Sequence, residues 1–189
     1  FPKNAWVHAH YGNWAWTQNN FSLAEIHLKK ALGLQIIYPW ANFRLAVVYI
    51  SQNKWEHALL SLKEGLKYEP KNEWALYKIG TALEMLGRNK DAIQHYESFI
   101  ENNPIKSILF NRLSNLYWKE LLFKKGENIL LLGLKKLPSE TSLIEKLVNY
   151  YESHGLYEKA LNILTSFTKL ETNNSAALAK IGFFENKLN

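Results

Sequence analysis

The sequence repeats with a period of 34 residues, and this regularity constrains the fold more than any other feature. Three columns keep the interval, namely Trp6, Trp40 and Trp74, then Ala24, Ala58 and Ala92, and finally Pro70, Pro104 and Pro138. A fixed period of 20 to 50 residues is typical of repeat architectures, in which each unit packs mainly on its neighbours. We therefore expect a linear array of similar units.

The array is uninterrupted when the first unit begins at Ala5. The units then span residues 5–38, 39–72, 73–106, 107–140 and 141–174, and a partial sixth unit covers 175–189. No shift in composition marks a linker, so a single domain over residues 1–189 is predicted. Because the chain opens without a methionine, we expect it to be a fragment of a longer protein.

Each unit has the pattern of two helices. In the third unit, apolar and small residues at helical spacing predict a first helix over about 73–86. Gly87 is expected to end it in a left-handed conformation. A second helix is predicted over about 89–100, and Pro104 closes the unit because proline cannot continue a helix. The predicted fold class is all-α, with five full helix pairs and one C-terminal helix.

Composition excludes several functional classes. The 189 residues contain no cysteine, which rules out disulfide scaffolds, cysteine nucleophiles and thiolate zinc sites. No apolar run is long enough to cross a bilayer, and no signal peptide opens the chain, so a cytoplasmic location is expected. The net charge of +6 is compatible with an anionic partner but does not by itself indicate nucleic acid.

The unit resembles the tetratricopeptide repeat (TPR) over nearly the whole chain. The small residue of position eight is present in five units, as Gly12, Ala46, Gly80, Ser114 and Gly182, whereas Val148 departs from it. The small residue of position twenty is Ala24, Ala58, Ala92, Gly126 and Ala160. The pentatricopeptide repeat, an RNA reader, is the nearest alternative, but its period is typically one residue longer. The resemblance implies a right-handed α-solenoid.

The resemblance also implies a binding groove lined by the first helix of each unit, at positions two, five, six, nine, twelve and thirteen. Position six is basic or titratable throughout: His10, Arg44, Lys78, Arg112, Lys146 and Lys180. Position two supplies Trp6, Trp40 and Trp74, position nine supplies Asn13, Asn115 and Asn149, and position twelve supplies Trp16 and Trp118. We expect an aromatic N-terminal part of the groove with a basic ladder along its length. The alternative is that these cations are merely solvated and the tryptophans merely packed.

The leading functional hypothesis is a non-catalytic scaffold that binds a protein or peptide, in particular an acidic one. An alternative is the TPR region of a larger enzyme such as a glycosyltransferase, where it would hold an acceptor or an anionic glycan polymer. Nucleic acid is the least favoured partner. The clamp of chaperone-adaptor TPR domains is rejected, because only Asn13 and Lys78 fit its pattern.

The sequence offers no candidate catalytic residue, metal site or cofactor site. His8 and His10 are two residues apart, so they point to different faces of a helix and cannot share a metal. The other four histidines, His27, His57, His95 and His154, are scattered without a carboxylate at ligand spacing. No glycine-rich phosphate loop or paired acid–base motif occurs.

The first unit is unusually aromatic for a terminal repeat, which normally carries a polar outer face. It holds Trp6, Tyr11, Trp14, Trp16 and Phe21. Its outer side is therefore predicted to contact a preceding domain or a second copy of the chain, giving a homodimer through the N-terminal repeat. The alternative is that all five rings turn inward onto the second repeat.

Overall fold

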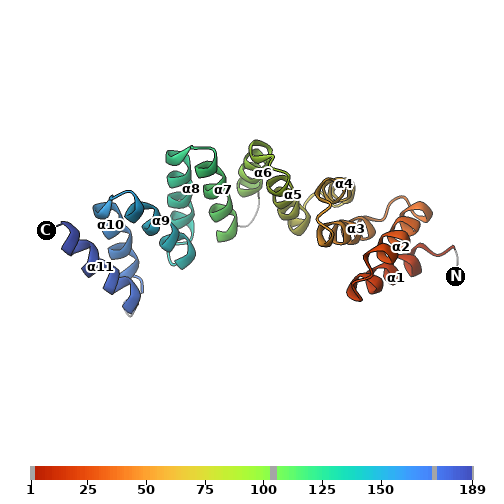
Figure 1. Ribbon diagram of the computed structural model, residues 1–189, viewed down its shortest axis with the longest axis horizontal. Coiled ribbons are helices and arrows are strands. Elements are labelled where there is room, and N and C mark those ends of the chain that lie inside the picture. Colours follow the sequence, from red (N-terminus) through yellow and green to blue (C-terminus); the bar gives the residue numbers. More distant parts are fainter. Residues whose placement is uncertain (1–2, 103–105, 172–173, 189) are drawn as a thin grey trace. The chain divides into compact units, whose positions relative to one another are not determined.

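The computed structural model describes residues 3–102, 106–171 and 174–188, and these residues form helices and turns without a strand. The helices are labelled in Figure 1. Their bounds are α1 Ala5–Thr17, α2 Phe21–Leu34, α3 Pro39–Ser51, α4 Trp55–Leu66, α5 Glu73–Met85, α6 Asn89–Asn102, α7 Ser107–Lys119, α8 Phe123–Lys136, α9 Thr141–Ser153, α10 Tyr157–Thr168 and α11 Ser175–Leu188. The predicted all-α fold is confirmed, and so are both helices predicted for the third unit, within two residues at each end.

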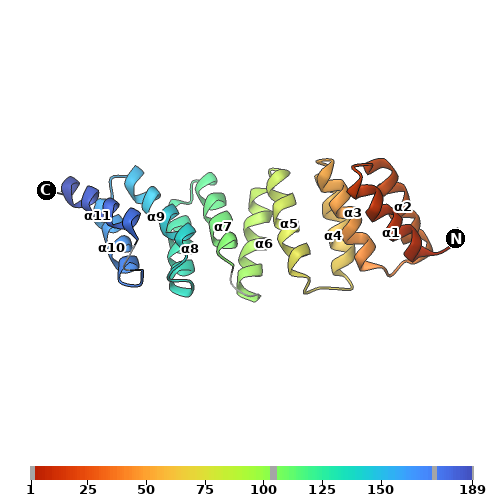
Figure 2. The same ribbon diagram turned by 90° about the horizontal axis from the view of Figure 1, so that it is seen from below.

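The chain forms two compact units, Phe1–Phe99 and Ile100–Asn189, and the boundary falls within α6. In the N-terminal unit each helix from α1 to α4 packs on the next one along the chain, and the same holds from α7 to α10 in the C-terminal unit. Figure 2 shows these antiparallel pairs from a second direction. The first helices of successive repeats also contact each other, α1 with α3 and α7 with α9. Packing between adjacent repeats is the arrangement expected of a repeat protein. A single domain over the whole chain stays a prediction.

Other side chains fill the space beside the glycines at positions eight and twenty of the complete units. All five residues at position twenty are buried, as are Gly12, Ala46, Gly80, Ser114 and even Val148 at position eight. A β-carbon at Gly80 would lie 2.2 Å from the Tyr96 ring, and one at Gly126 would lie 2.2 Å from the Trp118 ring. Each ring therefore packs directly on the backbone of a neighbouring helix, which offsets the low helix propensity of glycine.

The turn within every helix pair has the same geometry. Position fifteen adopts a left-handed backbone in all five complete units, at Asn19, Asn53, Gly87, Leu121 and Gly155. The amide of the following residue then donates to the carbonyl of position eleven, for example Arg88 to Leu83 at 2.9 Å. This bond satisfies a carbonyl that the helix end would leave unpaired. The prediction for Gly87 is confirmed, whereas Leu121 occupies a conformation that a branched side chain disfavours.

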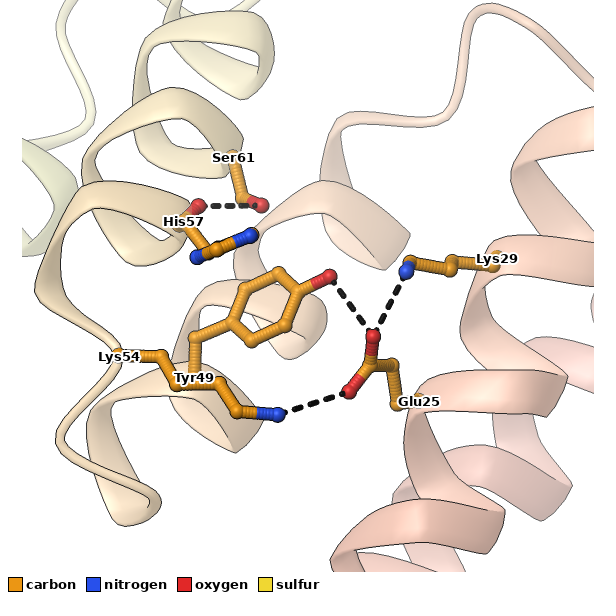
Figure 3. A network of polar contacts seen from close by, with 6 residues as sticks. All are labelled: Glu25, Lys29, Tyr49, Lys54, His57 and Ser61. Carbon is orange, nitrogen blue, oxygen red and sulfur yellow. Dashed lines mark hydrogen bonds and ion pairs between the residues drawn. The ribbon is translucent and has the colours of Figure 1, made fainter.

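In the described part of the chain, a partly buried hydrogen bond from a tyrosine to a glutamate joins successive repeats at two places. In the N-terminal unit, Tyr49 of α3 donates to Glu25 of α2 at 3.2 Å, and Lys29 approaches the same carboxylate at 2.6 Å (Figure 3). Lys54 lies 3.5 Å from its other oxygen. These contacts, led by the hydrogen bond from Lys29, hold the pKa of Glu25 below its ordinary value.

The C-terminal unit repeats the motif at the same positions. Tyr151 of α9 donates to Glu127 of α8 at 2.8 Å, and Lys159 donates to the same oxygen at 2.8 Å. Burial alone would raise the pKa of Glu127, but these two hydrogen bonds outweigh it and the pKa is lowered. We call each contact a Tyr–Glu lock, because it joins the second helix of one repeat to the first helix of the next.

Proline closes two described units, since Pro70 follows α4 and Pro138 follows α8. Pro104 lies outside the described residues.

Candidate binding surface of the first helices

The first helix of each repeat brings positions two and six to one face, because residues four apart lie one turn apart on a helix. In the N-terminal unit this places Trp6 beside His10 on α1, with ring centroids 4.1 Å apart. It likewise places the Arg44 guanidinium over the Trp40 ring on α3, at 5.1 Å from the centroid. The periodicity thus pairs an aromatic ring with a cation or imidazole on each of these two helices.

The two helices are then joined through the same residues. The His10 ring stacks on the Trp40 ring at 4.8 Å with an interplanar angle of 22°. Beyond Trp40, the Phe43 ring contacts Trp74 of α5 edge-on at 6.1 Å. We call this set of six residues, Trp6, His10, Trp40, Phe43, Arg44 and Trp74, the aromatic–cation surface. Trp6 is 60% exposed and Trp74 is 39% exposed, so the surface is open to solvent.

A cavity of about 280 Å³ opens within the aromatic–cation surface, lined by Trp40, Phe43, Arg44, Val47, Asn72 and Trp74. Asn72 is already engaged, because it caps α5 by accepting from the Ala75 amide and donates to Glu69. Arg44 is the charged residue of the lining, and among the described residues no carboxylate pairs with it. The cavity therefore combines apolar walls with one available cation.

The remaining predicted residues of the N-terminal unit lie apart from this cavity. Lys78 is half-buried, with its ammonium 5.8 Å from the centre of the neighbouring Tyr77 ring. Trp16 is half-buried and donates to Ser51 at 3.0 Å, which links α1 to α3. The side-chain oxygen of Asn13 is buried without a hydrogen-bond partner among the described residues.

Two of the equivalent cations of the C-terminal unit, Lys146 and Lys180, are engaged internally. The Lys146 ammonium of α9 donates to the backbone carbonyl of Asn111 on α7 at 2.7 Å and lies 5.7 Å from the centre of the Trp118 ring. Burial lowers the pKa of Lys146 to about 8. Trp118 in turn stacks on Tyr150 at 4.8 Å and fills the space beside Gly126. Lys146 and Trp118 thus act as packing between helices α7, α8 and α9.

Lys180 of α11 is also paired, since it donates to Asn149 at 3.0 Å and to Glu152 at 3.3 Å. It borders a smaller cavity of about 100 Å³ that also includes Glu145. Asn115 is exposed on α7, and Arg112 is half-buried on the same helix. The structure therefore brings the predicted site residues together in neighbouring groups, but the two units differ in how their cations are used.

Three cavity residues were not singled out from the sequence. Phe43 and Val47 occupy positions five and nine, so the groove columns of the repeat would have identified them. Asn72 lies in the turn before α5, where no column of the first helix predicts it.

The rings of the first repeat divide between two environments. Trp16 and Phe21 pack against the core, whereas Tyr11 is 42% exposed and Trp14 is 51% exposed. The alternative in which all five rings turn inward is therefore wrong. The residues equivalent to Tyr11 and Trp14 in the second and third repeats are buried, namely Leu45 and Val48 on α3 and Ile79 and Ala82 on α5. Tyr11 and Trp14 thus occupy the positions that a preceding helix pair covers elsewhere in this unit.

Two histidines of the first repeat form a packed pair. The Nδ1 atoms of His8 and His27 lie 3.0 Å apart across α1 and α2, so one donates while the other accepts. Burial is the main cause that lowers the pKa of His27, and the nearby His8 lowers it further. Within the described ranges, no group of three or more metal-binding side chains gathers. No helix in that part of the chain is both long enough and apolar enough to cross a bilayer.

Comparison with known proteins agrees with this geometry. A TPR repeat family model matches residues 47–87, and a second tetratricopeptide repeat model matches residues 74–104. No curated protein sequence matches the chain significantly.

Several solved structures share the fold. The MamA protein superposes with a TM-score of 0.74 at 18% identity, covering 93% of this chain and 96% of its own. YrrB, described as a TPR protein with an unusual peptide-binding site, superposes with a TM-score of 0.66 at 19% identity, covering 94% and 91%. PilF of Pseudomonas aeruginosa superposes with a TM-score of 0.66 at 18% identity, covering 97% and 85%. Residues 47–104 therefore match tetratricopeptide repeats, and the chain shares the helical-repeat fold of these solved structures.

Proposed function

We propose that this chain is a non-catalytic scaffold that binds a protein or peptide along the first helices of its N-terminal repeats. The observation that carries the proposal is the meeting of His10 and Arg44, from two different helices, on the ring of Trp40. Tryptophan and arginine are the residues that most often dominate binding energy at protein interfaces. Here they are gathered around a cavity rather than dispersed into the core.

The difference in charge use supports the N-terminal unit as the binding region. Lys146 and Lys180 already donate to internal oxygens, and a ligand would have to displace those bonds. Arg44 has no such competitor among the described residues, so binding an anionic group to it breaks no ion pair. An acidic partner is therefore favoured over a neutral one.

A random peptide library displayed on phage tests this function. We expect the wild-type protein to enrich a family of sequences, and we expect the variant Trp40→Ala combined with Arg44→Ala to lose them. Lys180→Ala serves as the matched control and should retain the same family. Failure of the wild-type protein to enrich any sequence would refute the proposed function.

We also propose that Tyr11 and Trp14 form a self-association surface. In a two-fold dimer the same residues of both copies would cover one another, giving each ring the burial that its equivalents have in later repeats. Sedimentation velocity should show a concentration-dependent dimer that Trp14→Glu abolishes. A wild-type protein that stays monomeric at high concentration would exclude this surface.

The enzyme-linked alternative, with its glycan acceptor, stays a prediction, and so does the weaker nucleic-acid hypothesis.

A further inference from the structure

We infer that the cavity of the aromatic–cation surface takes one large apolar side chain of an acidic peptide segment, with a carboxylate beside that side chain paired to Arg44. The inference rests on the proposed function and specifies its ligand. It follows from three properties of the cavity: its volume, its apolar walls and its single available cation.

The volume selects a side chain over a whole small molecule. Sites for cofactors and drug-sized ligands typically occupy about 300–1,000 Å³ and enclose most of the ligand. The cavity here is about 280 Å³, at the lower limit of that range, and the surface around it is open. A ligand inserted here would be anchored by one group while the rest of it lay along the exposed helices. An extended peptide has this form.

The walls select a large apolar or aromatic side chain. Trp40 and Trp74 supply indole rings from two helices, and Phe43 and Val47 supply apolar surface between them. Aromatic pairs with ring centroids within about 7 Å contribute stabilisation beyond the area that they bury. An alanine or a serine in the same place would leave these walls in contact with water.

The cation selects an acidic neighbour. The Arg44 guanidinium is held over Trp40 and has no described carboxylate partner, so its donors remain available to a ligand. Arginine and carboxylate form paired, directional hydrogen bonds. The His10 ring stacks on the same Trp40 ring. A basic segment would meet like charge here and is excluded.

The smaller cavity of the C-terminal unit lacks this combination. Its cation Lys180 is already bound to Asn149 and Glu152, and Glu145 lies in its lining. The same acidic segment would therefore be repelled there, which makes the C-terminal unit an internal control.

Three capped heptapeptides test the inference, with binding measured by calorimetry on the whole chain. The first carries one phenylalanine between two pairs of aspartates, the second replaces the phenylalanine with alanine, and the third replaces the aspartates with asparagines. We expect the second and third peptides to bind at least tenfold more weakly than the first. Arg44→Gln should weaken the first peptide at least tenfold while leaving the third unchanged.

A variant with a filled cavity separates the cavity's contribution to peptide affinity from the general attraction between opposite charges. Val47→Phe places a ring in the cavity and should abolish the advantage of the phenylalanine peptide over the alanine peptide. Lys180→Gln should leave all three affinities within twofold of wild type, and circular dichroism verifies that each variant keeps its helices.

The outcomes distinguish this inference from the proposed function. Equal binding of the phenylalanine and alanine peptides would overturn the cavity assignment, and so would a library consensus without an acidic and a large apolar residue. Either result leaves the proposed function standing, provided that the wild-type protein still selects peptides through Trp40 and Arg44. A library in which nothing is enriched would overturn both.

Discussion

In the N-terminal unit the position-six cations Arg44 and Lys78 lie over aromatic rings, whereas in the C-terminal unit Lys146 and Lys180 donate to internal oxygens. Arg44 rests on Trp40, while Lys146 reaches the Asn111 carbonyl and Lys180 reaches Glu152. Both units share the helix pair, the left-handed turn and the Tyr–Glu lock. The same repeat position can therefore supply a charge for binding in one unit and a charge for packing in the other, because the side chains around it determine its contacts.

Both units use small residues at position eight, and substitutions there are expected to change stability the most. Gly80→Ala should lower the free energy of unfolding by about 1–3 kcal/mol, because the new β-carbon meets the Tyr96 ring. Gly182 lies in the same column on α11, and no atom of the described residues lies within 4 Å of the place its β-carbon would take. Gly182→Ala should therefore raise the free energy of unfolding by up to about 1 kcal/mol. Urea unfolding measures both. Equal effects would show that the column is not governed by packing.

Charge reversal tests whether Arg44 and Lys180 differ in their contribution to binding. Arg44→Glu should weaken binding of the aspartate–phenylalanine peptide by roughly 10- to 100-fold, the usual range for losing a charge-assisted hydrogen bond. Lys180→Glu removes the same charge from the C-terminal unit and should change the affinity by less than about twofold. Calorimetry at two salt concentrations provides the measurement. If Lys180→Glu had the larger effect, the assignment of the binding region to the N-terminal unit would be wrong.

The two units share the Tyr–Glu lock, so removing the tyrosine hydroxyl should have the same effect on stability in each unit. Tyr49→Phe and Tyr151→Phe should each lower the free energy of unfolding by about 1 kcal/mol, the typical net contribution of one hydrogen bond. The pKa values of Glu25 and Glu127 are lowered in the folded chain, so their stabilisation is present at neutral pH. It is lost as the pH falls below the ordinary value of about 4.5. Urea unfolding at pH 7 and pH 3 should show a smaller acid loss in the two variants than in the wild type.

A smaller effect is expected at the turns. Leu121→Gly should raise the free energy of unfolding by less than about 1 kcal/mol, since glycine adopts the left-handed conformation without strain but gains freedom in the unfolded chain. Gly87→Ala places a side chain at the equivalent left-handed position of the third repeat, and it should lower the free energy of unfolding. Thermal unfolding of both variants measures the difference, and a destabilised Leu121→Gly protein would contradict the assigned geometry.

The smallest effect concerns Lys146. Its folded pKa of about 8 lies below the ordinary 10.5, so the unfolded chain binds more protons between these values and stability should rise with pH across that window. Lys146→Met keeps the packing on Trp118 but removes the buried charge. It should raise the free energy of unfolding at pH 7 by less than about 1 kcal/mol and flatten the rise above pH 8. An unchanged pH profile would show that another group titrates there.

The sequence by itself determined the helix pairs, the small residues where helices cross and the proline or glycine at several boundaries. These features depend on local periodicity and on contacts between adjacent units. Both can be read from a 34-residue repeat in the sequence. It also placed Trp6, His10, Trp40 and Arg44 in columns of one face, because helical spacing alone fixes that arrangement.

Only the tertiary structure decided what each column does. The sequence could not show that Lys146 turns toward the Asn111 carbonyl, or that Leu121 takes the backbone conformation that Gly87 takes in the third repeat. It did not reveal that Asn72 completes a cavity between Trp40 and Trp74. The physical reason is that these outcomes depend on which groups from other helices approach a side chain, and on the water that they remove. Neither is encoded in the spacing of a single repeat.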